Sequence, residues 1–131
     1  MTARPSITRI NPPELGTPPG YSQVVEVSAG RRPDRARPRR QRRRQGDFAR
    51  QAAQVFDNLT IALRASGCTA AHPVKLTVFL TEMNNHGTYR EARNRFFASV
   101  RPPAAPAVTL VEVSRLYSPG FFIEIEAIAA I

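Results

Sequence analysis

Few side chains in this sequence combine a reactive type with a useful spacing. Glu124 and Glu126 alternate with isoleucines near the C-terminus. A carboxylate there could position a water if its pKa and orientation suit, although carboxylates on a strand face are usually solvated. His72 and His86 fall in loops without a partner at metal-ligand spacing, so we expect no metal site and no cofactor. Cys68 follows a helix end with no catalytic histidine nearby, which indicates an ordinary thiol.

Further candidates are side chains that could line a binding cleft. Tyr21 begins a β-prone stretch, where it could line a cleft or simply pack at a subunit edge. Arg90 and Arg93 fall on the polar face of an expected helix, where solvation is the default. Nothing in their spacing favours a particular ligand.

The charge of the chain is concentrated in one segment. Residues 31–44 (RRPDRARPRRQRRR) hold nine of the 19 basic side chains and one acid, Asp34, and the whole chain has a net charge of +9. The rest carries ten basic and nine acidic side chains, so it is a nearly neutral domain. A local basic run and a basic domain face imply different partners.

Three interpretations of residues 31–45 stay open. The arginines could tether a nucleic acid by neutralising phosphates, although no interleaved aromatic would stack on bases. The segment could be a natural disordered insertion without a partner. We favour a pair of compensating frameshifts, because Arg, Pro, Ala and Gln are what a GC-rich gene yields in a shifted frame and the composition reverts at Gly46. Reading the gene in its other frames over this segment tests that hypothesis.

Size and composition favour one cytoplasmic domain over residues 1–131. A chain of 131 residues, 42% of them hydrophobic, can bury a proper core. No apolar run approaches the ~20 residues that span a bilayer, and the N-terminus has no apolar signal region. The single cysteine excludes an internal disulfide. We therefore expect neither a membrane segment nor secretion.

Two helices should help to position the candidate residues. Asp47 is a good N-cap for a helix over about residues 48–66, which Gly67 ends. Its apolar stripe comprises Phe48, Ala52, Val55, Phe56, Leu59, Ala62 and Leu63. After a polar loop at residues 81–87, a second helix should run over about residues 88–99. Its expected inward side chains are Tyr89, Ala92 and Phe96, with Val100 as a further candidate.

Alternating or β-branched segments predict the strands. They cover residues 6–10, 21–28, 73–80, 107–113 and 121–129. The segment 73–80 is apolar enough to be covered on both faces. In the last strand Ile123 and Ile125 face one way and Glu124 the other. The arginine run has two prolines and no apolar residue larger than alanine, so we expect it to supply no core strand.

This order of elements predicts an α+β domain. Two helices stacked on one face of a mixed sheet would bury both apolar stripes. The opposite face of the sheet is then left without cover, and in a chain this short other subunits usually provide it. We therefore expect an oligomer.

A set of segments occurs here in a distinctive order and spacing. It comprises GDFARQAAQVFDNLTIALRASG, PVKLTVFLTEMNN, REARNRFF, PAVTLVEVSRL and IEIEAIA. Over about residues 20–30 and 46–131 the chain resembles the RidA/YjgF family of reactive-intermediate deaminases. The resemblance implies a chorismate-mutase-like fold and a homotrimer with small-molecule clefts at its subunit interfaces. Archetypal members hydrolyse enamine/imine intermediates, formed by pyridoxal-phosphate enzymes, to 2-oxo acids and ammonia. Some relatives are described as endoribonucleases.

Within this resemblance the family's cleft residues are only partly present. Tyr21, in Pro-Gly-Tyr, matches the family's cleft tyrosine, and Glu124 matches the glutamate thought to position the attacking water. Val108, in Pro-Ala-Val, replaces the arginine that grips the substrate carboxylate, and Arg90 replaces an asparagine often found at that position. The Ser-Gly-Gln strand of the cleft wall should fall within residues 31–45 and is missing.

The resemblance implies a hydrolytic deaminase of reactive enamine/imine intermediates or of a related small carbonyl metabolite. Because Val108 cannot form the bidentate fork that arginine makes with a carboxylate, activity on amino-acid-derived substrates should fall by several powers of ten. Two alternatives stay open. One is a non-catalytic ligand-binding or regulatory trimer of the same fold. The other, less favoured, is an RNA-binding or RNA-cleaving relative that uses the basic segment.

Overall fold

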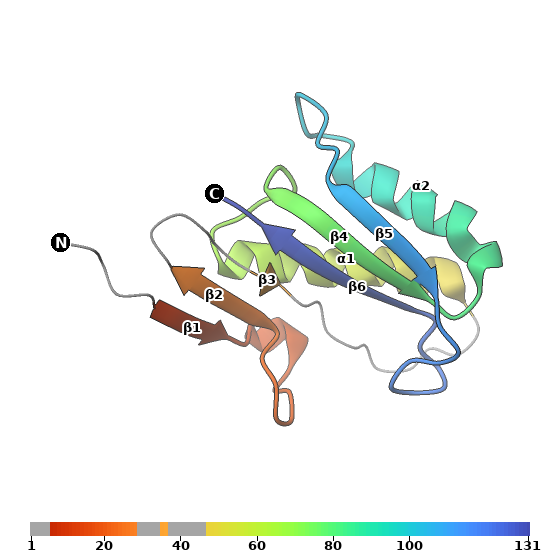
Figure 1. Ribbon diagram of the computed structural model, residues 1–131, viewed down its shortest axis with the longest axis horizontal. Coiled ribbons are helices and arrows are strands. Elements are labelled where there is room, and N and C mark those ends of the chain that lie inside the picture. Colours follow the sequence, from red (N-terminus) through yellow and green to blue (C-terminus); the bar gives the residue numbers. More distant parts are fainter. Residues whose placement is uncertain (1–5, 29–34, 37–46) are drawn as a thin grey trace.

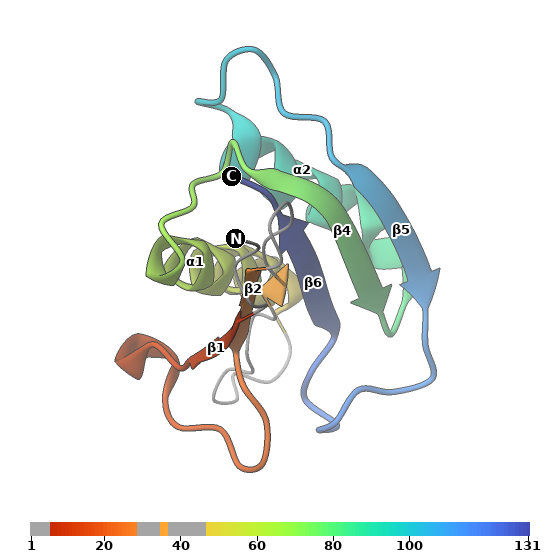
Figure 2. The ribbon, with the colours of Figure 1, turned by 60° about the vertical axis from the view of Figure 1, so that its left-hand side comes forward.

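The computed structural model describes residues 6–28, 35–36 and 47–131, which form one six-stranded sheet with two helices on one of its faces (Figures 1 and 2). The strands are β1 (Ser6–Ile10), β2 (Val24–Ser28), β3 (Arg35–Ala36), β4 (Pro73–Leu80), β5 (Ala107–Glu112) and β6 (Ile123–Ala129). The helices are α1 (Phe48–Ala65) and α2 (His86–Phe97), with short 3-10 turns at Pro13–Leu15 and Met83–Asn85.

The strand order in the sheet is β1-β2-β3-β6-β4-β5. β4 and β5 are parallel and every other neighbouring pair is antiparallel, so the sheet is mixed. The predicted α+β class, with two helices on one face of a mixed sheet, is confirmed.

Helix α1 begins and ends as its sequence predicts. The Asp47 carboxylate accepts a hydrogen bond from the backbone N–H of Arg50 at 3.4 Å and so caps the first turn. Gly67 ends the helix with a φ of 70°, a left-handed conformation that favours glycine. Of the predicted stripe only Phe48 stays partly exposed. The cap and the stripe together hold α1 against the sheet.

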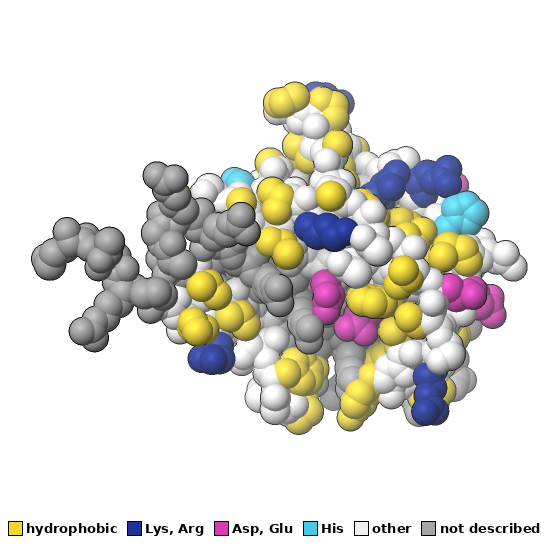
Figure 3. All heavy atoms as spheres, viewed as in Figure 1, with side chains coloured by type: hydrophobic (Ala, Val, Ile, Leu, Met, Phe, Trp, Pro, Cys, Tyr) yellow, Lys and Arg dark blue, Asp and Glu magenta, His cyan; other side chains and the backbone are white. Residues whose placement is uncertain are grey.

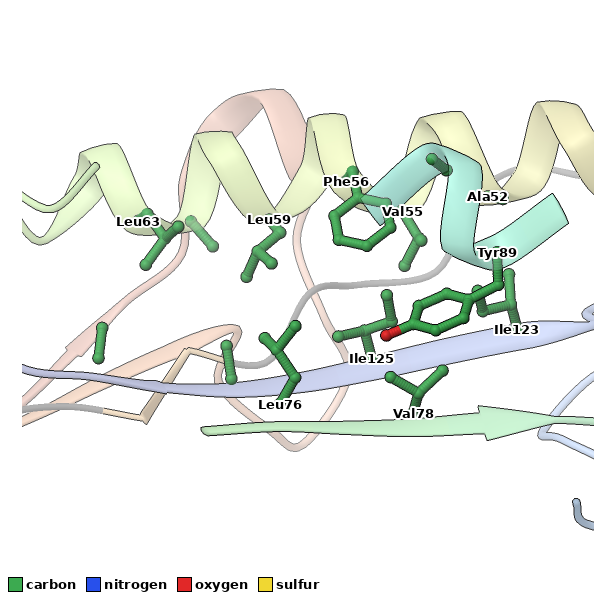
Figure 4. Close-up of a cluster of buried hydrophobic side chains, with 14 of the residues drawn as sticks. Ala52, Val55, Phe56, Leu59, Leu63, Leu76, Val78, Tyr89, Ile123 and Ile125 are labelled. Carbon is green, nitrogen blue, oxygen red and sulfur yellow. The ribbon is translucent and has the colours of Figure 1, made fainter. Parts of the chain in front are cut away.

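The core lies between the helices and the sheet. Figure 4 shows Leu59 and Phe56 of α1 pointing toward the strands, where they meet side chains such as Ile125. The Phe56 ring stacks on Tyr89 of α2 with 6.2 Å between ring centroids. Helix α2 starts at His86, two residues earlier than predicted, and a 3-10 turn occupies part of the expected loop. Among the described residues no helix is long and apolar enough to cross a membrane.

Strand β4 has the predicted bounds but only one covered face within this chain. Leu76, Val78 and Leu80 are buried under the helices. Val74 is 50% exposed, and the side chains that alternate with the buried ones are only partly covered. The prediction that both faces are covered is wrong for the single chain, because both helices pack on the same side of the sheet.

Strand β3 corrects the expectation that the arginine run supplies no core strand. Arg35–Ala36 lies between β2 and β6, antiparallel to both. The reason is that a ladder uses backbone N–H and C=O groups, which every residue except proline provides in full, and both flanking strands need a partner. The rest of the run, and with it the frameshift hypothesis, lies outside the described residues.

The sheet face away from the helices, here called the open face, mixes apolar and charged side chains. The strand register and the alternating burial assign to it Ile7, Arg9, Val25, Val27, Lys75, Thr77, Phe79, Thr109, Val111, Glu124, Glu126 and Ile128. Figure 3 looks onto this face, where apolar side chains are interspersed with basic and acidic ones. The predicted alternation of the last strand is confirmed, since Ile123 and Ile125 are buried while Glu124 is not.

Candidate functional site

A shallow groove of about 740 Å³ lies beside β2 and the loop that precedes it. Its lining residues are Arg9, Gly20, Tyr21, Ser22, Gln23, Val25 and Val27. The groove therefore combines a cation and two hydroxyls with an apolar wall. Tyr21, predicted as a cleft residue, is 38% exposed here. The volume of the groove is in the range of small-molecule sites.

Gln23 holds the loop that carries Tyr21. The side chain is fully buried, and its Nε2 donates hydrogen bonds to the carbonyls of Leu15 at 2.9 Å and Gly16 at 3.2 Å. Its backbone N–H donates to Oδ1 of Asn11 at 3.0 Å. Sequence reasoning missed this residue. The available signal was the long Pro/Gly-rich loop, whose backbone groups need partners that a neighbouring amide can supply.

Glu124 lies on the open face of β6. It is half-buried and stands opposite Phe79 of β4 in the register. Tyr21 belongs to the groove beside β2, and β3 separates β2 from β6 in the sheet. Glu124 thus shares the open face with the groove residue Val25 but is not among the groove's described lining.

Val108 and Arg90 lie elsewhere. Val108 stands opposite the buried Leu76 on the helix side of the sheet, at the edge strand β5, and is 38% exposed. Arg90 is exposed on α2. Since β2 and β5 are four strand spacings apart in the order, the two strands are separated by roughly 19 Å across the sheet. Tyr21 lies in the loop before β2, and Val108 lies on β5. One chain does not bring the predicted cleft residues together.

Gln51 of α1 fixes the loop that leads into β6. Its Nε2 donates to the carbonyl of Gly120 at 2.7 Å, and its Oε1 accepts from the backbone N–H of Phe122 at 2.9 Å. The backbone N–H of Thr81 donates to the carbonyl of Phe122 at 3.2 Å. Two residues before Glu124, the chain is therefore held at both its N–H and its C=O. The sequence signal is weak: a glutamine beside the apolar stripe of α1.

Tyr89 of α2 has a clearly shifted acidity. Burial raises the pKa of its phenol above the usual value, and the Arg93 guanidinium acts in the opposite direction. The guanidinium carbon of Arg93 lies 5.9 Å from the centre of the Tyr89 ring. Figure 4 shows the phenol of Tyr89 lying among core side chains, with its oxygen toward Ile125.

The remaining sequence candidates take local roles in the structure. Nδ1 of His72 accepts a hydrogen bond from the backbone N–H of Thr69 at 2.7 Å, and Nδ1 of His86 lies 2.9 Å from the carbonyl of Met83. Cys68 is buried. Within the described residues no group of three or more His, Cys, Asp or Glu side chains could hold a metal ion.

The fold and the sequence together define the class of protein. The family model described as Endoribonuclease L-PSP matches residues 15–131. A structure of a YjgF-family protein from Mycobacterium tuberculosis superposes with a TM-score of 0.70 at 26% identity, covering 96% of this chain and 100% of that one. The chain belongs to this family, the RidA/YjgF family, which confirms the resemblance of its sequence.

Individual relatives differ in what their names say. The protein DfrA of Myxococcus xanthus is 37% identical over 114 residues, 83% of each chain. The 2-iminobutanoate/2-iminopropanoate deaminase of Rattus norvegicus is 38% identical over 84 residues, which are 64% of this chain and 58% of the relative. A putative translation initiation inhibitor from Vibrio vulnificus has a TM-score of 0.74 at 34% identity, covering 88% of this chain and 92% of that one.

Proposed function

We propose that this protein is a cytoplasmic homotrimer, with a chorismate-mutase-like fold, that hydrolyses a small imine, enamine or related carbonyl metabolite in clefts between its subunits. The observation that carries the proposal is that one of the relatives is named as an imine deaminase. This chain also has Tyr21 in the lining of a groove and Glu124 opposite Phe79 on the open face. No metal or cofactor is part of the proposal.

The geometry supports a site between subunits. Tyr21 and Val108 lie toward opposite edges of the sheet, so a cleft that uses both positions needs two chains. The open face also leaves apolar side chains exposed, among them Ile7 and Val111. Burying such surface against sister subunits is favourable at about 25 cal/mol per Å² of apolar area.

Imine hydrolysis requires few catalytic groups from the protein. A water attacks the imine carbon, the resulting carbinolamine loses ammonia as its carbon–nitrogen bond breaks, and a carbonyl remains. Glu124 orients the water, accepts its first proton and passes it to the imine nitrogen. When the carbon–nitrogen bond breaks, the hydroxyl proton of the carbinolamine moves through Glu124 to the same nitrogen, which leaves as ammonia. Val108 offers no charge to a substrate carboxylate. That last point favours a second candidate, a non-catalytic ligand-binding trimer.

Release of 2-oxobutanoate from freshly generated 2-iminobutanoate tests the proposal. We expect the wild-type protein to exceed the buffer rate and Glu124→Gln to lose most of that excess. Glu126→Gln changes a carboxylate on the same face of the same strand and should leave the rate within about twofold. A wild-type rate equal to buffer would support the non-catalytic candidate, and equal losses in both variants would reject the assigned role of Glu124.

The RNA alternative has a separate test. It relies on residues 31–44, most of which lie outside the described part of the chain. Salt-dependent RNA binding that disappears when this segment is deleted would support it. Binding that is unchanged by the deletion would remove the segment from consideration.

A further inference from the structure

We infer that the groove beside β2 is an anion-binding site in which Arg9 holds a small carboxylate that carries a short aliphatic body. The inference rests on the proposed function in one respect: it names the charged contact for the substrate at the cleft that Tyr21 lines. Nothing in the spacing of the sequence singled out Arg9, which lies in the first strand.

The register places the cation against an apolar wall. Arg9 stands directly opposite Val25 across the β1–β2 ladder, and Val27 follows two residues along the same face. Directly opposed side chains on neighbouring strands have Cβ atoms about 5 Å apart, so the guanidinium and the valines line one surface. Figure 1 shows β1 and β2 side by side at one edge of the sheet.

The charge at Arg9 is not neutralised by the described part of the chain. Arg9 is exposed and makes no ion pair with any described side chain. Glu26, the nearest acid on β2, stands opposite Thr8 and so points to the other face of the sheet. Among the described residues that line the groove, Arg9 carries the only charge. An anion is therefore the complementary ligand.

The other lining groups narrow the ligand to a carboxylate. A guanidinium presents two parallel N–H donors that match the two oxygens of a carboxylate. Val25 and Val27 supply apolar contact for a short aliphatic body, and the hydroxyl of Ser22 is available to a neighbouring carbonyl or imine group. Tyr21 lines the same groove.

Equilibrium binding of 2-oxobutanoate, measured by calorimetry without turnover, tests the inference. Arg9→Gln should weaken binding roughly 10- to 100-fold, the loss of one charge-assisted fork. Arg9→Lys keeps the charge but not the fork and should fall between. Arg64→Gln removes an exposed arginine from α1, which covers the other face of the sheet, and should bind like wild type. Thermal unfolding of each variant confirms that the fold is kept.

Two further probes and the turnover assay separate the possible outcomes. The neutral analogue 2-butanone should bind wild type and Arg9→Gln equally weakly. Unchanged 2-oxobutanoate binding in Arg9→Gln, or tighter binding of inorganic phosphate than of 2-oxobutanoate, would overturn the inference. If Arg9→Gln loses binding while wild type shows no turnover, the anion site stands and the deaminase proposal fails. If the wild-type protein turns over substrate but Arg9→Gln binds 2-oxobutanoate normally, the deaminase proposal stands and the anion site fails.

Discussion

Removing the side-chain amide of Gln51 should destabilise the fold far more than removing a neighbouring glutamine. Gln51→Ala deletes the hydrogen bonds to Gly120 and Phe122 and leaves a buried glycine carbonyl and a half-buried N–H without their partner. At about 1 kcal/mol for each hydrogen bond, and more where a buried group stays unsatisfied, the free energy of unfolding should fall by about 2–3 kcal/mol. For a chain of this size that corresponds to roughly 6–15 °C in Tm.

The matched control is Gln54→Ala on the same helix. The Gln54 amide donates a hydrogen bond to Oδ1 of Asn58 at 3.0 Å, one turn along the same helix. Within the described part of the chain it bonds to no other element. Both substitutions replace glutamine by alanine in a helix, so the difference in helix propensity cancels. We expect Gln54→Ala to cost less than about 1 kcal/mol.

Urea unfolding followed by circular dichroism, at one fixed protein concentration, measures both variants. Hydrogen exchange of the Phe122 amide adds a local readout, because this N–H loses its acceptor only in Gln51→Ala. Equal destabilisation by the two variants, or unchanged exchange at Phe122, would refute the reasoning.

Two further predictions concern the core phenol and the open face. Since burial raises the pKa of Tyr89 above its usual value of 10.0, the folded state holds the proton more tightly, and the free energy of unfolding should fall as pH rises above about 10. Tyr89→Phe should lack this part of the fall in urea midpoints between pH 9 and 11, and identical profiles would contradict it. For the proposed trimer, Val111→Glu places a charge on the open face and should yield monomers in sedimentation velocity, whereas Ala53→Glu on the exposed side of α1 should not. If the wild-type protein is a monomer at micromolar concentration, the proposal that sister subunits cover the open face is wrong.

The family comparison and the structure make different parts of the proposed activity testable. One relative is named as an imine deaminase, and the reaction class proposed on that basis is tested by Glu124→Gln. The structure supplies the groove and its cation, which Arg9→Gln tests. The two experiments read turnover and equilibrium binding, so one can fail without the other.

Local and periodic signals in the sequence were enough for most of the elements. Asp47 and Gly67 mark the ends of α1 because capping depends on groups within one turn of the helix. The alternation around Ile125 identifies β6 and its buried side because successive side chains on a strand face opposite ways. The family pattern around Tyr21 predicts a cleft residue; in the structure Tyr21 lines the groove beside β2, and its role there stays a prediction.

Only the tertiary structure decided which segments became neighbours. The place of β3 between β2 and β6, the position of β5 at the far edge from β1, and the roles of Gln23 and Gln51 could not be read from composition or period. Gln51 meets Gly120 across 69 residues of chain. Backbone groups of a strand and side-chain amides form hydrogen bonds with any partner of the right geometry. Their actual partners therefore depend on how the helices and strands pack together, which sequence patterns do not specify. That packing separates Tyr21 from Val108 and sets Arg9 beside the groove.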